Sequence, residues 1–191
     1  MSTHPTPVQG ASQEPPMSRR QARSILFTGL LIGIGVAGFL DETLFHQLLQ
    51  WHAFYWATDQ HGRILSDGLF HLFSTLLLLW GLLRVWRGRA HWTEASGPLM
   101  IAGILMGAGG FNVYDGVIQH AILHFHLVNE HVCNRAVTQG DNTLANCPQD
   151  IPYEILWDSL GLIILVIGVI LWRHTIRALQ TSCVHEEPAE R

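Results

Sequence analysis

The chain has 191 residues, of which 48% are hydrophobic and only 14% are charged, and its formal net charge is −4. Ordinary soluble domains carry about 25% charged residues, so this composition is unusually apolar for a soluble protein. All eleven basic residues are Arg, too few for the basic stripe of a nucleic-acid-binding protein. Three Cys residues without a Cys-x-x-Cys pair exclude a disulfide scaffold and a zinc ribbon.

The apolar residues fall in four long runs rather than in amphipathic stripes. The runs cover residues 25–51, 64–86, 98–124 and 155–172. Each approaches or exceeds the roughly 20 residues that a helix needs to cross a hydrocarbon layer about 30 Å thick. The sequence therefore predicts an all-α integral membrane protein, a four-transmembrane-helix bundle within residues 25–174.

Polar segments flank this bundle. Residues 1–24 are rich in Pro, Ser, Thr and Gln and lack apolar periodicity, which predicts a disordered tail, and residues 175–191 form a second solvated tail. Arg residues gather before the first run, between the second and third runs, and after the fourth. They are Arg19, Arg20, Arg23, Arg84, Arg87, Arg89, Arg173 and Arg177. Because positive charge marks the cytoplasmic side, we expect both termini to be cytoplasmic.

The predicted outer loop, residues 127–153, contains Cys133 and Cys147. In an oxidising compartment outside the cytoplasm these two residues are expected to form a disulfide. Closing a loop of this size stabilises the fold by about 3 kcal/mol in the chain-entropy estimate. The competing interpretation makes both residues metal ligands.

Titratable side chains inside membrane spans are costly and mark functional sites. A rise of 1.5 Å per residue places such groups from all four spans in one outer layer of the membrane. The candidates for ligands, or for groups that orient ligands, are His46, His71, His120, His124, Asp41, Asp67, Asp115 and Asp158. Imidazole and carboxylate together bind zinc, iron or copper(II), so we expect a transition-metal centre of unresolved metal identity.

The spacing of the candidates limits how they meet. Asp67 and His71 lie one helical turn apart and share a face. Asp41 and His46 are five residues apart, about 140° around an ideal α-helix. One mononuclear site cannot accept every candidate. The pattern predicts two sites, or carboxylates that only orient ligands, or a helix that carries a π-bulge.

Three other interpretations of these residues stay open. Buried ion pairs and hydrogen bonds would hold the bundle together without a ligand. A proton relay would use the same Asp and His residues without metal. Two His residues on facing helices would also hold a haem, which the surrounding Asp residues make less attractive.

Several stretches are similar to a known family. They are Gly38–Asp41, Leu44–His52, Leu65–His71, Gly110–His120 and Trp157–Asp158. These stretches resemble the bacterial family of predicted membrane proteins catalogued as domain of unknown function 2243. The resemblance implies a four-span fold in the bacterial inner membrane and brings no established activity.

The resemblance covers about residues 24–175 and departs at Glu42, where the family commonly has Gly. The two halves of the chain also resemble each other. Asp41 is followed five residues later by His46, and Asp115 is followed in the same way by His120. This pattern predicts a duplicated helix pair around a pseudo-two-fold axis along the membrane normal.

The sequence therefore favours a bacterial inner-membrane metalloprotein with a metal centre near the periplasmic face. Its role would be redox or hydrolytic chemistry, metal handling, or assembly of a respiratory metalloenzyme. The alternatives are a small transporter or proton-coupled protein that uses the Asp and His pairs without metal, and a structural or partner-binding bundle. Membrane lipid is the expected partner, with a second copy of the chain or a respiratory complex as further candidates.

Overall fold

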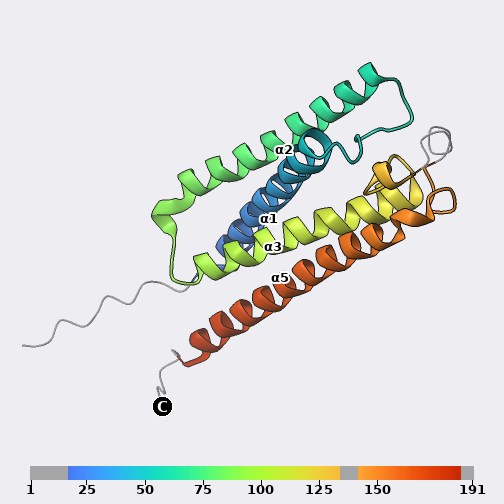
Figure 1. The fold of residues 1–191 in the computed structure, drawn as a ribbon. Helices are drawn as coiled ribbons and strands as arrows, with labels where there is room; N and C mark the ends of the chain where they lie inside the picture. The colour runs from blue at the N-terminus through green and yellow to red at the C-terminus, as the bar shows by residue number, and fades with distance from the viewer. Residues whose placement is uncertain (1–16, 134–141, 186–191) are drawn as a thin grey trace, which may run out of the picture.

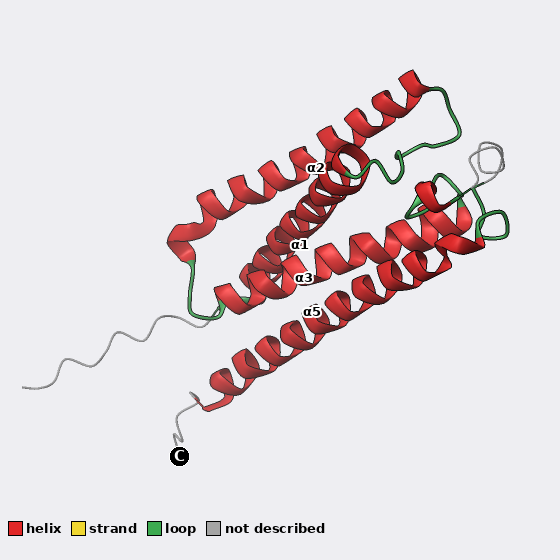
Figure 2. Cartoon of the chain, in the orientation of Figure 1, coloured by secondary structure: helices red, strands yellow, loops and turns green. Residues whose placement is uncertain are grey.

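The computed structural model of the protein describes residues 17–133 and 142–185 (Figure 1). These residues form helices and loops and contain no strand, which confirms the all-α prediction (Figure 2). Of the tails predicted for residues 1–24 and 175–191, residues 1–16 and 186–191 lie outside the described residues. Residues 19–24 and 175–185 belong to helices instead of tails, because the first and fourth helices extend beyond the apolar runs.

Four long helices make up the bundle, and each is long and apolar enough to cross a membrane. They are α1 (Arg19–Asp41), α2 (Gln60–Gly88), α3 (Ser96–Tyr114) and α5 (Ile151–His185). The helix α1 begins before residue 25, the predicted start of the first span. The Ser18 side chain caps it by accepting a hydrogen bond from the Gln21 backbone N–H at 3.2 Å.

Shorter helical segments complete the described chain. Two are π-helical and continue directly from α1 and α3: η1 (Glu42–Leu48) and η3 (Asp115–Ile122). Three are 3₁₀ turns: η2 (Arg89–His91), η4 (Glu130–Val132) and η5 (Pro148–Asp150). The π-helical segments lie at the same end of the bundle, opposite the start of α1 and the end of α5 (Figure 1).

The long helices lie side by side in the order α2, α1, α3, α5. α1 and α3 pack against each other, α2 packs against α1, and α5 packs against α3; among the described residues α2 does not contact α5. In the most apolar window of each helix, α1 and α3 are 44% and 33% buried, but α2 and α5 only 17% and 11%. The outer helices α2 and α5 therefore expose their apolar side chains to lipid, where such exposure has no free-energy cost.

The central pair approaches closely because glycines meet at its interface. A Cβ atom built on Gly29 would lie 2.9 Å from the Gly103 Cα, and one built on Gly103 would lie 2.9 Å from the Gly29 Cα. Gly33 and Gly107 make similarly close contacts with backbone atoms of the opposite helix. Small residues let transmembrane backbones pack tightly where lipid gives no hydrophobic driving force.

The pairing of glycines follows the predicted duplication. Gly29 and Gly33 occupy the same places in α1 as Gly103 and Gly107 occupy in α3, and α2 packs on α1 as α5 packs on α3. The first and second helix pairs are therefore related by a pseudo-two-fold axis that passes between α1 and α3.

The segments that follow the two π-helices cross over each other. The Glu130 backbone N–H donates to the Trp51 carbonyl oxygen at 2.8 Å, and the Trp56 N–H donates to the Phe125 carbonyl oxygen at 3.0 Å. These two bonds occupy equivalent places in the two halves, so the crossing obeys the same pseudo-symmetry.

The second of these segments leads to the predicted disulfide. Cys133 and Cys147 are bonded, with their Cα atoms 5.3 Å apart. The bond joins the end of η4 to the start of η5 and therefore ties this loop to the first turn of α5.

Glu130 gives this loop a predicted pH dependence. The residue is fully buried, and one carboxyl oxygen accepts the Leu127 backbone N–H at 3.1 Å. Burial raises the pKa of its carboxyl from an ordinary value of 4.5 to about 7. Between these two pH values the folded protein keeps a proton that the unfolded chain releases. The stability that the protonated carboxyl contributes is therefore fully present below pH 4.5 and is lost as the pH rises through 7.

We expect the free energy of unfolding of the wild-type protein to fall by about 3 kcal/mol, relative to that of Glu130→Gln, between those two pH values. The glutamine keeps the shape of the side chain and does not titrate. Chemical unfolding in detergent across the pH series measures the difference. Parallel pH profiles for the two proteins would contradict the prediction.

Candidate metal centre

The π-helical segments place the first Asp and His of each half on a common face. An α-helix would set residues five apart about 140° from each other, whereas π-helical turns close hydrogen bonds between residues five apart. The Leu49 N–H donates to the Leu44 carbonyl and the Leu123 N–H to the Ile118 carbonyl, each at 2.8 Å and each over this longer turn. The side chains of His46 and Asp41 therefore lie on the same face of the helix.

A left-handed turn then brings a second His back to each site. Gln50 has φ 53° and His124 has φ 52°, the positive values that end a helix sharply. Beyond each turn the next N–H returns to the helix: Trp51 donates to the Phe45 carbonyl at 2.8 Å, and Phe125 donates in the same way at 2.9 Å. The chain is reversed within a few residues, so the following His points at the helix it has just left.

Two equivalent groups of one Asp and two His result. Each group offers ligand atoms that all lie within 4.8 Å of one another. The groups are Asp41, His46 and His52 in the first half and Asp115, His120 and His126 in the second. All six residues are buried.

Matching distances in the two groups show how closely the halves agree. The Nε2 atom of His46 lies 3.5 Å from an Asp41 oxygen, and that of His52 lies 3.9 Å from the other oxygen. In the second group the corresponding distances to Asp115 are 3.1 Å for His120 and 3.8 Å for His126.

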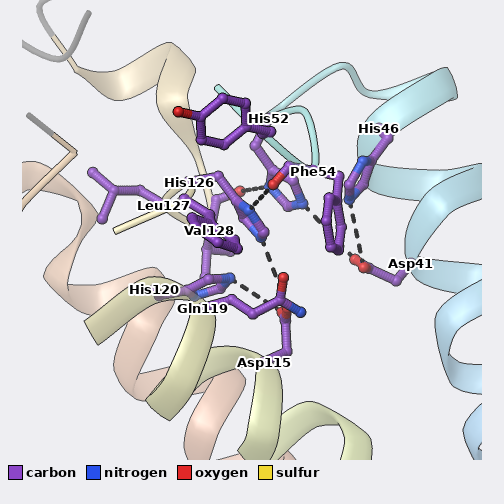
Figure 3. A network of polar contacts seen from close by, with 12 residues as sticks. Asp41, His46, His52, Phe54, Asp115, Gln119, His120, His126, Leu127 and Val128 are labelled. Atoms are coloured by element: carbon purple, nitrogen blue, oxygen red, sulfur yellow. Dashed lines mark hydrogen bonds and ion pairs between the residues drawn. The ribbon is translucent and has the colours of Figure 1, made fainter. Parts of the chain in front are cut away.

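The two groups face each other (Figure 3). The rings of His52 and His126 stack with centroids 4.6 Å apart and an interplanar angle of 18°. His46 lies 4.4 Å from His52, and His120 lies 4.6 Å from His126. The four imidazoles therefore form one continuous cluster with an Asp on either side.

Every imidazole uses its Nδ1 atom to hold its orientation. His52 Nδ1–H donates to the Val128 carbonyl at 2.7 Å, and His126 Nδ1–H donates to the Phe54 carbonyl at 3.0 Å. The pattern is reciprocal, because Phe54 and Val128 are equivalent residues in the two crossing segments. Since a carbonyl oxygen only accepts, the proton is fixed on Nδ1.

Carboxylates play this role for the other two rings. His46 Nδ1–H donates to Asp67 at 3.1 Å, and His120 Nδ1–H donates to Glu154 at 2.9 Å. The same carboxylates also accept backbone N–H groups, Asp67 from Phe54 at 2.7 Å and Glu154 from Val128 at 3.2 Å. A carboxylate on the outer nitrogen of a His is the usual support of a metal ligand.

The inner atoms make ion-pair contacts between His and Asp but no hydrogen bonds in the part of the chain that the structure describes. Within the described residues, the Nε2 atoms of all four rings are buried and have no hydrogen bond, as are Asp41 Oδ1 and Asp115 Oδ2. Burial, followed by neighbouring imidazoles, lowers the pKa of His52 and of His126 well below the ordinary value. These two rings are therefore neutral and present lone pairs, the form that binds a metal ion.

A family model for predicted membrane proteins, DUF2243, matches residues 28–175. The chain belongs to this family. No curated protein and no solved structure matches it. The match confirms the resemblance predicted from the sequence, and it includes all six residues of the two groups. The family description places its members in the membrane and names no activity. Any activity of this chain therefore has to be inferred from the geometry of the two groups.

The first half of this DUF2243 chain has a further carboxylate. Glu42 is fully buried, and its Oε2 atom lies 3.2 Å from His46 Nδ1, the atom that also contacts Asp67. These three residues form another group with ligand geometry. Gly116 takes the place of Glu42 in the second half, and a Cβ atom there would collide with the Asp158 carboxylate.

Three of the predicted ligands lie outside the two groups. His71 is partly buried beside Phe39, and its Nδ1 atom is 3.5 Å from the Gln47 amide. His124 is exposed and bonds to the His120 carbonyl at 3.0 Å. Asp158 is partly buried next to Gly116. Of the other candidates, His46, His120, Asp41 and Asp115 belong to the groups, and Asp67 orients His46.

The sequence-based choice omitted His52, His126 and Glu154 from the candidate ligands and orienting groups. A stricter use of the internal repeat identifies the two histidines, because His52 follows His46 at the same distance as His126 follows His120. His124 does not satisfy that repeat. For Glu154 the only signal is its equivalence with Asp67, which requires aligning α2 with α5.

Removing the supporting carboxylates tests their role. We expect Asp67→Asn and Glu154→Gln each to weaken metal binding by the half concerned about 10–100-fold, because the amide keeps an acceptor oxygen but loses the negative charge that raises the basicity of the ligand. Competition with a coloured chelator in detergent measures the affinity. Asp59→Asn is a suitable control, since that carboxylate only caps the start of α2 through Gly62. Unchanged affinity in both test variants would contradict this role.

Proposed function

We propose that the protein is a membrane metalloprotein whose two Asp-His-His groups bind a pair of first-row transition-metal ions. The observation that carries the proposal is the set of four buried imidazole Nε2 atoms without hydrogen bonds, each on a ring held by its Nδ1 atom. Leaving buried polar atoms unpaired costs free energy, so a metal ion that accepts their lone pairs explains the arrangement.

The ligand atoms of the two groups restrict which metal ions would bind. Two ligands of one ion, each about 2.0–2.2 Å away, lie at most about 4.4 Å apart, so small side-chain movements suffice to close each group. Imidazole nitrogen and carboxylate oxygen favour iron, zinc, manganese or copper(II) over copper(I), which prefers sulfur. Two His and one carboxylate leave coordination positions open, as in non-haem iron sites.

We therefore propose redox chemistry at a pair of non-haem iron sites, with metal-assisted hydrolysis as the corresponding activity if the ions are zinc. The open positions would bind substrate. The protein would supply orientation through Asp67, Glu154 and the crossing carbonyls, and the buried surroundings would exclude water. Proton transfer across the membrane without a metal is less well supported, because a relay needs polar groups along its path. α1 has only apolar and small residues between Thr28 and Asp41.

We place the centre on the periplasmic side of a bacterial inner membrane. Support comes from the Arg residues near the opposite end of the bundle and from the disulfide, which needs an oxidising compartment.

Elemental analysis and spectroscopy of the detergent-purified protein test the proposal. After reconstitution with iron(II) and dialysis, we expect about two iron atoms per chain and, after oxidation, the electron paramagnetic resonance signal of non-haem ferric iron or of a coupled pair. Parallel reconstitutions with zinc, manganese(II) and copper(II) report the same stoichiometry if one of these metals is native. Failure to retain any of the four metals, or a Soret band from haem, would overturn the proposal.

A further inference from the structure

An apolar cavity of about 510 Å³ lies beside the centre, between α1, α2 and α3. Its walls include Phe54, Phe70 and Phe111, whose rings form a stacked series with centroids 5.0 Å and 5.9 Å apart. The volume is within the range of small-molecule sites, roughly 300–1,000 Å³. Aromatic walls of this kind favour a ligand that contains an aromatic ring.

The cavity reaches the metal groups through two of its walls. The Phe70 ring lies 5.8 Å from the His46 ring, and the Gln119 side chain, which lines the cavity, donates from Nε2 to Asp115 at 2.9 Å. Phe73 and Tyr114 border the cavity and are more than half exposed. The cavity therefore opens on the apolar surface of α2 and α3 and ends at the centre.

Gln119 contributes a polar side chain to the wall of this apolar cavity. Gln119 is 97% buried, and its Oε1 atom has no hydrogen-bond partner among the described residues. The orientation of the amide is fixed, because the Asp115 carboxylate accepts and so must face the NH₂ group. The unpartnered acceptor therefore belongs to a residue of the cavity wall, and a hydroxyl donor of a ligand would satisfy it.

The acceptor belongs to one half only. The residue equivalent to Gln119 in the first half is Phe45, whose ring packs at 5.3 Å against both Trp51 and Trp157. Where the second half presents a hydrogen-bond acceptor, the first half presents an aromatic ring. The pseudo-symmetric centre is thus asymmetric at the point where a ligand would approach.

We propose that this cavity binds a membrane-dissolved phenol or hydroquinone that carries an alkyl chain, with its ring among the phenylalanines and its hydroxyl on Gln119 Oε1. This assignment rests on the proposed function, since it names the substrate class of the metal centre. The bilayer supplies the ligand, and the apolar opening between α2 and α3 admits it.

Binding of two matched probes tests the proposal. Ring-fluorinated para-nonylphenol and para-nonylanisole differ in that a methyl group replaces the hydroxyl hydrogen, which removes the donor. Each is titrated into the protein in lipid nanodiscs, empty nanodiscs are subtracted, and fluorine NMR follows the bound fraction. We expect the phenol to bind saturably and about tenfold more tightly than the anisole, because only the phenol satisfies the buried acceptor.

Two variants and a control sharpen the result. Gln119→Leu should abolish the preference for the phenol and leave binding of the anisole unchanged. Phe111→Trp, which fills the cavity, should weaken both probes. Phe45→Leu, at the equivalent position of the other half, should leave both affinities as they are. Equal affinity of the two probes for the wild-type protein, or a preference that survives Gln119→Leu, would overturn the proposal.

Metal content measured on the same samples separates this inference from the proposed function. Protein that retains two ions but binds neither probe overturns the ligand site alone. Selective phenol binding that depends on Gln119, in protein that retains no metal, supports the ligand site and overturns only the metal centre.

Discussion

The His52→Ala variant is expected to lose one of two bound metal ions, whereas His71→Ala keeps both. His52 presents an unpartnered, buried Nε2 atom to Asp41 at 3.9 Å, but His71 is partly buried against Phe39 and belongs to neither group. Loss of a ligand should lower the metal affinity of the affected half by more than about a hundredfold, which exceeds the effect of losing a supporting carboxylate. Metal analysis after dialysis against a mild chelator gives the stoichiometry.

The second half supplies an independent test of the same result. His126→Ala should remove one ion, while His124→Asn should remove none, because that position is exposed and asparagine tolerates its left-handed backbone conformation. The double variant His52→Ala with His126→Ala should retain little metal. If the variants at His71 and His124 lose metal and those at His52 and His126 do not, the assignment of ligands is wrong.

A Gly103→Val variant is expected to lose both ions together. The added side chain would collide with Gly29 on α1, where a Cβ atom alone would come within 2.9 Å of the Cα. Overpacking of this kind costs about 1–3 kcal/mol and forces the helices apart. Because one metal group continues from each of these helices, separating α1 from α3 disturbs both groups and the contacts between them.

Chemical unfolding in detergent and metal analysis of the same preparation test this expectation. Gly110→Ala is the matched control, because it lies on α3 and its added Cβ atom would meet nothing within 4 Å. The control should unfold like the wild-type protein and keep two ions. A Gly103→Val protein with full metal content and unchanged stability would show that the glycine contact does not position the centre.

The pseudo-symmetry explains why the two metal groups are alike and where they differ. Duplicated helix pairs give the same Asp, His and His, the same left-handed turn and the same reciprocal carbonyls on both sides. Differences begin among the neighbouring residues, where the first half has Glu42 in place of Gly116 and Phe45 in place of Gln119. The duplicated scaffold therefore gives two Asp-His-His groups with unequal surroundings, one of them next to an apolar cavity.

Hydropathy predicted the four spans because a helix must present apolar side chains over a fixed length to cross lipid. All four appear as long helices, and the family match and the all-α class agree with the sequence-based expectation. The cysteine pair was also predictable, since only two cysteines share one loop. These features depend on residue type and local order along the chain.

The membership of the metal groups was harder to predict, because it depends on backbone geometry. Counting residues on an ideal α-helix places Asp41 and His46 on different faces and makes His71 look as suitable as His46. The π-helical turn changes the angle between Asp41 and His46, and the left-handed turn at Gln50 returns His52 to the site.

What the sequence by itself determined is the membrane location, the number of spans, the duplication and a layer rich in Asp and His. The tertiary structure alone decided which imidazoles face each other and which nitrogen of each is free. The physical reason is that each Nδ1 proton is held by an acceptor from another segment: the Val128 and Phe54 carbonyls and the carboxylates of α2 and α5. Such long-range partners have no periodicity along the chain, so only the packed helices and crossing segments define them.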